Sequence, residues 1–249
     1  MKKEKSTKVR MLLIYDYFDP AILAGGPIVS CANMVTFLCE DYEFFIYTSN
    51  RDLDGSVLPV VPDKWRSYKG IAQIMYGKKM WSARGYSKIV AEIKPDVIYI
   101  NGIYSFVGVI VPLFNSIIHK NCRRLIIAPR GMLQKNSLKE KRIKKKLFLI
   151  VFKMLTKLCN VRWHVTGDQE ETELQQLKIA KQMSSIIRVG NVPLFNKIER
   201  HKKHSGDVVK LLTIALISPM KNILFMASIS FSVLWSRIMI FRVLILRNN

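Results

Sequence analysis

Side chains able to bind anions or exchange protons follow several short apolar runs of the sequence. Asp16 follows the first run, and Gly25 and Gly26 precede a helical stretch. Glycines at such a turn let the backbone approach a ligand, and a helix N-terminus offers N–H groups to an anion. Asn101 and Arg130 follow two later runs, and a guanidinium can hold a phosphate or carboxylate through two hydrogen bonds. The Gly-x-Gly-x-x-Gly dinucleotide fingerprint is absent, so an ordinary turn at Gly25–Gly26 stays an alternative. A strand-ending turn at Asn101 and a surface arginine at Arg130 are the alternatives for the other two.

Two more residues have side chains suited to a ligand site. Lys221 lies in Ser218–Asn222, a predicted strand-to-helix turn where an ammonium group can neutralise a diphosphate. His164 lies within a predicted strand, where a single histidine is more often structural than catalytic. We expect no metal site, because the cysteines lack C-x-x-C spacing and are typical of buried apolar residues in a reducing compartment. The cysteines are Cys31, Cys39, Cys122 and Cys159.

The segment Lys135–Lys157 is strongly basic, with nine Lys or Arg against one acid, Glu140. Lys144, Lys145 and Lys146 form its centre, and apolar residues are interleaved with the charges. A basic amphipathic helix of this kind can bind a surface of anionic lipid. The same pattern fits a solvated face on a helix packed against the core, and the residues favour neither interpretation.

The composition favours a folded protein with an anionic partner. The chain has 249 residues, 49% of them hydrophobic, and a net charge of +22 from 40 Lys+Arg and 18 Asp+Glu. This hydrophobicity excludes intrinsic disorder, and the length is sufficient to bury a core. The charge is compatible with nucleic acid, an anionic membrane or a phosphorylated substrate. We expect no nucleic-acid partner, because the sequence has neither zinc-finger spacing nor an aromatic RNA-binding pattern.

Short apolar runs alternate with longer helical patterns, which predicts βαβ units in an α/β fold. Strands are predicted at Val9–Tyr15, Glu43–Thr48, Asp96–Ile100, Leu125–Ala128, Arg162–Val165 and Ser185–Val189. Helices are predicted at Val29–Cys39, Ser82–Ile93, Phe106–His119, Leu138–Leu158 and Gln169–Leu177. Continuous apolar strands between helices are typical of a parallel sheet covered on both faces, so we expect a Rossmann-like, doubly wound domain. Ser49–Lys79 is predicted to be a long irregular connection.

The pattern changes near Pro193, which predicts a domain boundary. We assign residues 1–193 to one Rossmann-like domain, 194–207 to a linker and 208–249 to the incomplete start of a second Rossmann-like domain. A strand is predicted there at Val208–Ile217. From Ile223 onward the chain carries no Asp, Glu or Lys, unlike a surface helix of a soluble domain. Three interpretations of this hydrophobic tail stay open. It is non-native sequence such as a frameshifted end, a membrane-associated helix at Ile223–Leu246, or an unusual buried helix.

In this order, the segments resemble the retaining glycosyltransferases of family 4, which have the GT-B fold of two facing Rossmann-like domains. Gly25–Pro27 looks like the family's N-terminal glycine loop, and Ala128–Leu133 is similar to its PRGML segment. Trp163–Glu170 resembles the H-x-T-x-x-Q/E-E segment of the family. Gly190–Pro193 resembles the N-x-P crossover between domains, and Ile217–Asn222 resembles the I-S-P-x-K-N phosphate turn.

The resemblance covers roughly residues 9–222 and implies transfer of a sugar from a nucleotide-sugar donor. It implies retained anomeric configuration, no required metal and no cofactor beyond that co-substrate. The donor would be bound mainly by the C-terminal domain, and the acceptor by the N-terminal domain. The residues would be Gly25, Gly26 and Lys221 at the donor phosphates, Asn101 and Arg130 as the catalytic pair, and Asp16, Arg130 and His164 on the acceptor side.

The sequence departs from the family pattern in three places. Tyr99-Ile100-Asn101 stands where members often have His-x-His, and Leu216 stands where an arginine usually precedes the phosphate lysine. The E-x7-E segment that grips the donor sugar is absent, since no glutamate follows Glu199. The resemblance thus implies a C-terminally truncated or frameshifted enzyme that retains the acceptor-side domain, and leaves catalysis by this chain alone open.

The expected function is glycosyl transfer to a cell-surface polysaccharide or a lipid-linked acceptor. Val9–Tyr15 is too short for the core of a signal peptide, so we expect a cytoplasmic chain. The resemblance implies that it works at the inner face of the cytoplasmic membrane, as a peripheral protein. The alternative is a protein without catalysis that binds an anionic membrane surface. It would use Lys144, Lys145, Lys146 and the hydrophobic tail.

Overall fold

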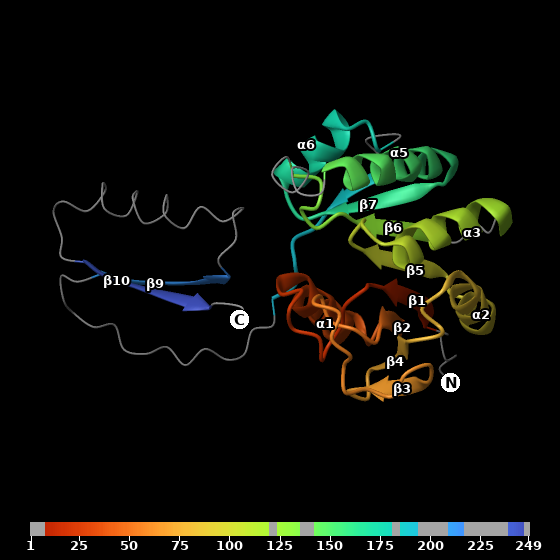
Figure 1. The fold of residues 1–249 in the computed structure, drawn as a ribbon, viewed down its shortest axis with the longest axis horizontal. Helices are drawn as coiled ribbons and strands as arrows, with labels where there is room; N and C mark the ends of the chain where they lie inside the picture. Colours follow the sequence, from red (N-terminus) through yellow and green to blue (C-terminus); the bar gives the residue numbers. More distant parts are fainter. Residues whose placement is uncertain are drawn as a thin grey trace, which may run out of the picture. The chain divides into compact units, whose positions relative to one another are not determined.

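The computed structural model describes residues 8–119, 124–134, 142–180, 185–193, 209–216 and 239–246. The chain divides into two compact units, Met1–Leu194 and Phe195–Asn249. The described part of the first unit is a sheet flanked by helices, and that of the second is a pair of strands (Figure 1).

The first unit is built on an eight-stranded sheet with the order β3-β4-β2-β1-β5-β6-β7-β8. Every neighbouring pair is parallel except β3 and β4, which are antiparallel. Parallel neighbours need long crossover connections, which the alternating helices supply. The strands are β1 (Val9–Ile14), β2 (Tyr42–Ser49), β3 (Trp65–Tyr68), β4 (Ala72–Gly77), β5 (Val97–Asn101), β6 (Arg124–Ala128), β7 (Val161–Val165) and β8 (Ile186–Arg188).

Helices cover both faces of the sheet, because successive side chains of a strand point to opposite sides. In β1, Leu12 and Ile14 pack in one core with residues of α2, α3 and α5, whereas Leu13 packs in a second core with α1. All three side chains are fully buried, as the continuous apolar run predicted. The helices are α1 (Gly26–Leu38), α2 (Ala83–Ile93), the π-helical turn η1 (Phe106–Ile110), α3 (Val111–His119), α5 (Arg142–Leu158) and α6 (Asp168–Gln176).

The strand order reverses at β1, whose neighbours are β2 on one side and β5 on the other (Figure 1). In open α/β sheets, ligands bind beyond the carboxyl ends of the strands at such a reversal. Ile14 pairs with Ile100, and Asn101 pairs with Ala128 of β6. Asp16, Asn101 and Arg130 therefore come to the same edge of the sheet, although they are far apart in the sequence.

The predicted α/β, Rossmann-like fold is confirmed for the first unit. The irregular connection predicted at Ser49–Lys79 is wrong in part, because it contains the antiparallel hairpin of β3 and β4. Lys69 and Gly70 close this hairpin with positive φ angles of 51° and 71°. β3 is a short edge strand in which Arg66 and Ser67 are exposed, so no apolar run marks it in the sequence.

Two parallel strands form the described part of the second unit, β9 (Val209–Leu216) and β10 (Met239–Leu246). β9 confirms the strand predicted at Val208–Ile217. Of the three interpretations of the tail, the helix at Ile223–Leu246 is wrong for the residues of β10, which form a strand. A short run of aliphatic and aromatic residues fits a buried strand as well as a helix, and periodicity does not separate the two.

Several expectations fall on residues that the structure leaves undescribed. Lys221 lies outside the described residues, as do the linker predicted at 194–207 and the tail segment 217–238. The roles expected of them stay predictions. Among the helices that the structure describes, none has the length and hydrophobicity needed to cross a membrane.

Candidate ligand site at the carboxyl edge of the sheet

Arg130 lies at the centre of the edge, directly after β6. Its Nε donates to Asn101 Oδ1 at 2.6 Å, its Nη2 donates to the Tyr99 hydroxyl at 2.9 Å, and its Nη1 donates to Asn191 Oδ1. The backbone turns sharply here, because Arg130 and Gly131 have φ angles of 55° and 71°. A non-glycine residue in this left-handed region is held there by its surroundings. The guanidinium is thus fixed by hydrogen bonds to residues of β5 and of the segment after β8.

A chain of hydrogen bonds runs from Arg130 to His164 on β7. The Tyr99 hydroxyl lies 2.7 Å from His164 Nδ1, and His164 Nε2 lies 2.9 Å from the Val189 carbonyl oxygen. A carbonyl oxygen only accepts, so Nε2 carries the proton and Nδ1 accepts from the Tyr99 hydroxyl. Burial lowers the pKa of His164, and the nearby Arg130 cation lowers it further. The imidazole is therefore neutral, and the tyrosine hydroxyl accepts from Arg130 while donating to His164.

Glu170, in the first turn of α6, fixes the turn that carries Arg130. Its Oε1 accepts from the Gly131 backbone N–H, and its Oε2 accepts from the Thr166 backbone N–H at 2.7 Å and the Thr166 hydroxyl at 2.9 Å. The side chain is buried, so these bonds are shielded from water. One carboxylate thus ties the start of α6 to the Arg130–Gly131 turn.

A polar cavity of about 300 Å³ opens between this turn and the N-terminus of α1. Gly25 precedes α1 with a φ of 68° and ψ of −135°, and no side chain caps the helix. This backbone conformation favours glycine, and it brings the first turn of α1 to the cavity. The lining residues are Gly26, Pro27, Ser30, Arg130, Gly131, Thr166, Glu170 and Asn191. An uncapped helix N-terminus and a fixed guanidinium on one cavity suit an anion such as a phosphate.

A second cavity of about 290 Å³ is mainly apolar and shares Arg130 and Asn191 with the first. Met34 and Leu38 of α1 and Ile126 of β6 form part of its wall. Tyr99 and His164 also line it, so the hydrogen-bond chain described above runs along this cavity. Asn33 Nδ2 donates to the Val192 carbonyl at 3.0 Å and joins α1 to the segment after β8.

Two polar atoms near the strand reversal have no hydrogen-bond partner among the described residues, Asn101 Nδ2 and Asp16 Oδ1. Asn101 is buried, with Oδ1 occupied by Arg130. Burial raises the pKa of Asp16 to about 6, although a hydrogen bond from Ser105 acts in the opposite direction. Buried groups of this kind normally have partners, so these two atoms are candidates to contact a ligand. A titratable carboxyl with such a pKa is also suited to proton transfer.

The structure brings together most of the residues predicted for the site. Asn101, Arg130 and His164 belong to one hydrogen-bonded chain, and Gly26 lines the polar cavity with Arg130. Gly25 shapes the entry to α1, and Asp16 follows β1 at the same edge. Their proposed roles toward a donor or an acceptor stay predictions.

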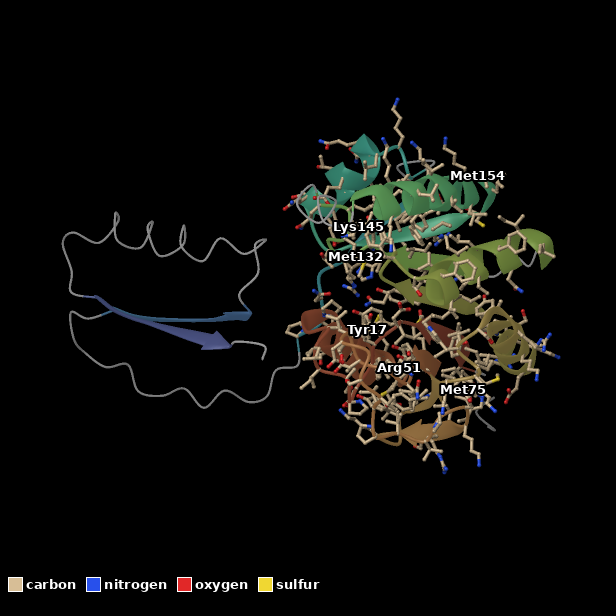
Figure 2. All side chains as sticks on the ribbon, viewed as in Figure 1. Tyr17, Arg51, Met75, Met132, Lys145 and Met154 are labelled. Carbon is tan, nitrogen blue, oxygen red and sulfur yellow. The ribbon has the colours of Figure 1, made fainter. Side chains whose placement is uncertain are left out.

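The three lysines predicted for a membrane surface lie elsewhere, on α5. Lys144 and Lys146 are exposed. Lys145 is labelled in Figure 2, and its Nζ lies 5.2 Å from the centroid of the Tyr104 ring. Lys145 therefore packs over an aromatic ring of the loop after β5. Among the residues that the structure describes, no group of three or more His, Cys, Asp or Glu could hold a metal ion.

Sequence reasoning missed Tyr99, Asn191 and Glu170 as parts of the site. Tyr99 lies in an apolar run, at the position where members of the resembled family often have a histidine. Asn191 and Glu170 lie in the two segments that resemble family motifs, Gly190–Pro193 and Trp163–Glu170. Their positions in those motifs could have indicated a role in the site. Spacing alone does not show that both segments contact the Arg130–Gly131 turn.

Comparison of the whole chain with known proteins shows a likeness in fold. No protein-family model matches it, and no curated protein matches it. It is similar to the solved S. aureus MnaA–UDP co-structure, with a TM-score of 0.51 and 11% identity, covering 96% of this chain and 62% of that one. A solved structure of a proposed UDP-N-acetylglucosamine 2-epimerase from Listeria monocytogenes has a TM-score of 0.45 and 15% identity. That match covers 86% of this chain and 55% of the other. The chain thus spans less than two thirds of either protein, and the likeness to MnaA agrees with the Rossmann-like sheet.

Proposed function

We propose that this chain belongs to an enzyme that transfers a sugar from a nucleotide-sugar donor to a hydroxyl of a saccharide or lipid-linked acceptor. The observation that carries the proposal is the polar cavity, which is lined by both the fixed Arg130 and the uncapped N-terminus of α1. Both features favour the diphosphate of a sugar nucleotide. The solved MnaA structure of similar fold contains UDP, which is a ligand of this class.

The proposed reaction forms a bond between the acceptor oxygen and the anomeric carbon, and breaks the bond from that carbon to the diphosphate. Negative charge develops on the departing diphosphate oxygen, and a prepositioned cation lowers the energy of that state. Arg130 supplies this cation, and the backbone N–H groups near Gly26 further stabilise the charge on the diphosphate. Lys221 is proposed as a further diphosphate contact.

The acceptor is proposed to lie at the strand reversal, beside Asp16 and Asn101. The unpartnered Asn101 Nδ2 donates to an acceptor oxygen, and Asp16 receives the hydroxyl proton. His164 acts on Arg130 through Tyr99 and is a positioning residue. Retention of configuration and membership of glycosyltransferase family 4 rest on the resemblance of the sequence segments and belong to this proposal.

Nucleotide binding tests this proposal, measured by isothermal titration calorimetry with UDP, GDP and ADP. We expect at least one of them to bind the wild-type chain. Arg130→Ala should weaken that binding about tenfold or more, because a charge-assisted hydrogen bond contributes about 1.5–3 kcal/mol. Arg162→Ala is the matched control, since Arg162 is exposed on β7 and lies outside the polar cavity. Equal affinity of both variants would refute the assignment of Arg130, and no binding of any nucleotide would refute the proposal.

A further inference from the structure

α5 has apolar residues on two sides, and only one side packs against the protein. Phe152 and Leu155 are buried in the core beneath the helix. The other side exposes Leu147 (65%), Ile150 (60%), Met154 (56%) and Leu158 (66%). Residues 147, 150, 154 and 158 are spaced at three and four, so they share one side of the helix. Met154 is labelled on α5 in Figure 2.

The neighbouring helix α3 also exposes apolar residues. Cys159, just after α5, donates to the Leu113 carbonyl of α3 at 3.4 Å, and both helices contribute to the same core. Phe114 and Ile118 of α3 are each 57% exposed and lie one turn apart. We name the six residues Phe114, Ile118, Leu147, Ile150, Met154 and Leu158 the α3–α5 face. Exposed apolar residues that gather on neighbouring helices are typical of an interaction surface.

Cationic side chains border the α3–α5 face. Lys144, Lys146 and Lys157 are exposed on α5, and Lys153 is half-buried. Neither α3 nor α5 contains an Asp or Glu. The face therefore combines exposed apolar residues with positive charge that no carboxylate of the same helices offsets.

We propose that the α3–α5 face binds the surface of an anionic lipid bilayer. Its apolar side chains enter the boundary between headgroups and acyl chains, and the long lysine stems bring ammonium groups to the lipid phosphates. A second copy of the chain fits less well, because a two-fold dimer through this face would place lysines opposite lysines. The inference is independent of the proposed function, since it involves no residue of the ligand site.

Flotation of the full chain with lipid vesicles tests the inference. One set of vesicles contains phosphatidylcholine alone, and the other contains equal parts of phosphatidylcholine and anionic phosphatidylglycerol. We expect binding to the anionic vesicles only. Leu147→Gln with Met154→Gln should weaken it about tenfold. Lys144→Glu with Lys146→Glu should weaken it about tenfold or more, because each lysine near such a surface contributes a factor of about five.

Matched controls carry the same changes on a distant part of the first unit. Leu53→Gln with Val57→Gln alters exposed apolar residues of the β2–β3 connection. Lys64→Glu with Arg66→Glu alters exposed cations at β3, the far edge strand. Both controls should bind like the wild type, and circular dichroism confirms that every variant is folded.

Three outcomes would overturn the inference. In the first, the wild-type chain fails to bind anionic vesicles. In the second, the Leu147 and Met154 changes leave binding unaltered, so that binding rests on nonspecific attraction by the net charge. In the third outcome, light scattering shows a wild-type dimer that the Leu147 and Met154 changes convert to a monomer. That result would assign the α3–α5 face to a second copy of the chain.

Discussion

Replacing Glu170 with glutamine should destabilise the protein out of proportion to the size of the change. The carboxylate accepts from the Gly131 N–H, the Thr166 N–H and the Thr166 hydroxyl. A glutamine keeps one acceptor oxygen and turns the other into a donor, so at least one buried N–H loses its partner. A buried donor without a partner costs about 1–3 kcal/mol. We therefore expect the free energy of unfolding to fall by about 1–3 kcal/mol beyond the effect of losing a charge.

Glu171→Gln is the control that isolates this effect. Glu171 also lies in the first turn of α6, so both substitutions remove the same favourable interaction with the helix dipole. Its described partner is the exposed Gln175 amide at 3.3 Å. Urea denaturation followed by circular dichroism measures both variants. Equal losses of unfolding free energy for the two variants would refute the claim that Glu170 holds the Arg130–Gly131 turn.

Three further predictions concern pH and packing. Because the folded protein raises the pKa of Asp16 from 3.8 to about 6, the contribution of Asp16 to the free energy of unfolding should decrease as pH rises through this window, by up to about 3 kcal/mol. The difference between the wild type and Asp16→Asn, in denaturation curves recorded from pH 4 to 7, measures this contribution. The pKa of His164 is lowered, so its nitrogen-15 NMR shifts should report the neutral Nε2–H tautomer at pH 7. The contribution of His164 to the free energy of unfolding depends on pH with the opposite sign to that of Asp16 and should fall as pH drops below 6.5. Tyr99→Phe should leave Nδ1 without its donor and shift the Nδ1 resonance, whereas an unshifted signal would contradict the hydrogen bond. Phe152→Ala should lower the free energy of unfolding by about 3–5 kcal/mol, whereas Leu147→Ala on the exposed side of α5 should change it by no more than about 0.5 kcal/mol. Similar losses of unfolding free energy for the two variants would show that the buried and exposed sides of α5 are misassigned.

The central sheet was predictable from sequence because its strands are buried on both faces. Runs such as Val9–Tyr15 are continuously apolar, and this pattern between helices leaves few alternatives to a parallel sheet. β3 escaped prediction because it is a short edge strand with exposed Arg66 and Ser67. β10 was not predicted as a strand: a helix was one of the interpretations of the tail, because a short apolar run carries no period that separates strand from helix.

The sequence predicted most residues of the candidate site, but not the hydrogen bonds that join them. Arg130 and Asn101 were expected because polar residues at strand ends meet at one edge of a parallel sheet. The Tyr99–His164 hydrogen bond depends on the register of β5, β6 and β7, which the sequence alone does not set. For α5 the sequence left membrane binding and core packing open, and the structure shows that different apolar residues of that helix serve the core and the surface.

A crystal structure of the chain with UDP tests the central claim most directly. The account predicts the diphosphate in the polar cavity, with its oxygens within hydrogen-bond distance of the Arg130 guanidinium and near the Gly26 backbone N–H. UDP bound elsewhere, with Arg130 still hydrogen-bonded only to Asn101, Tyr99 and Asn191, would contradict it.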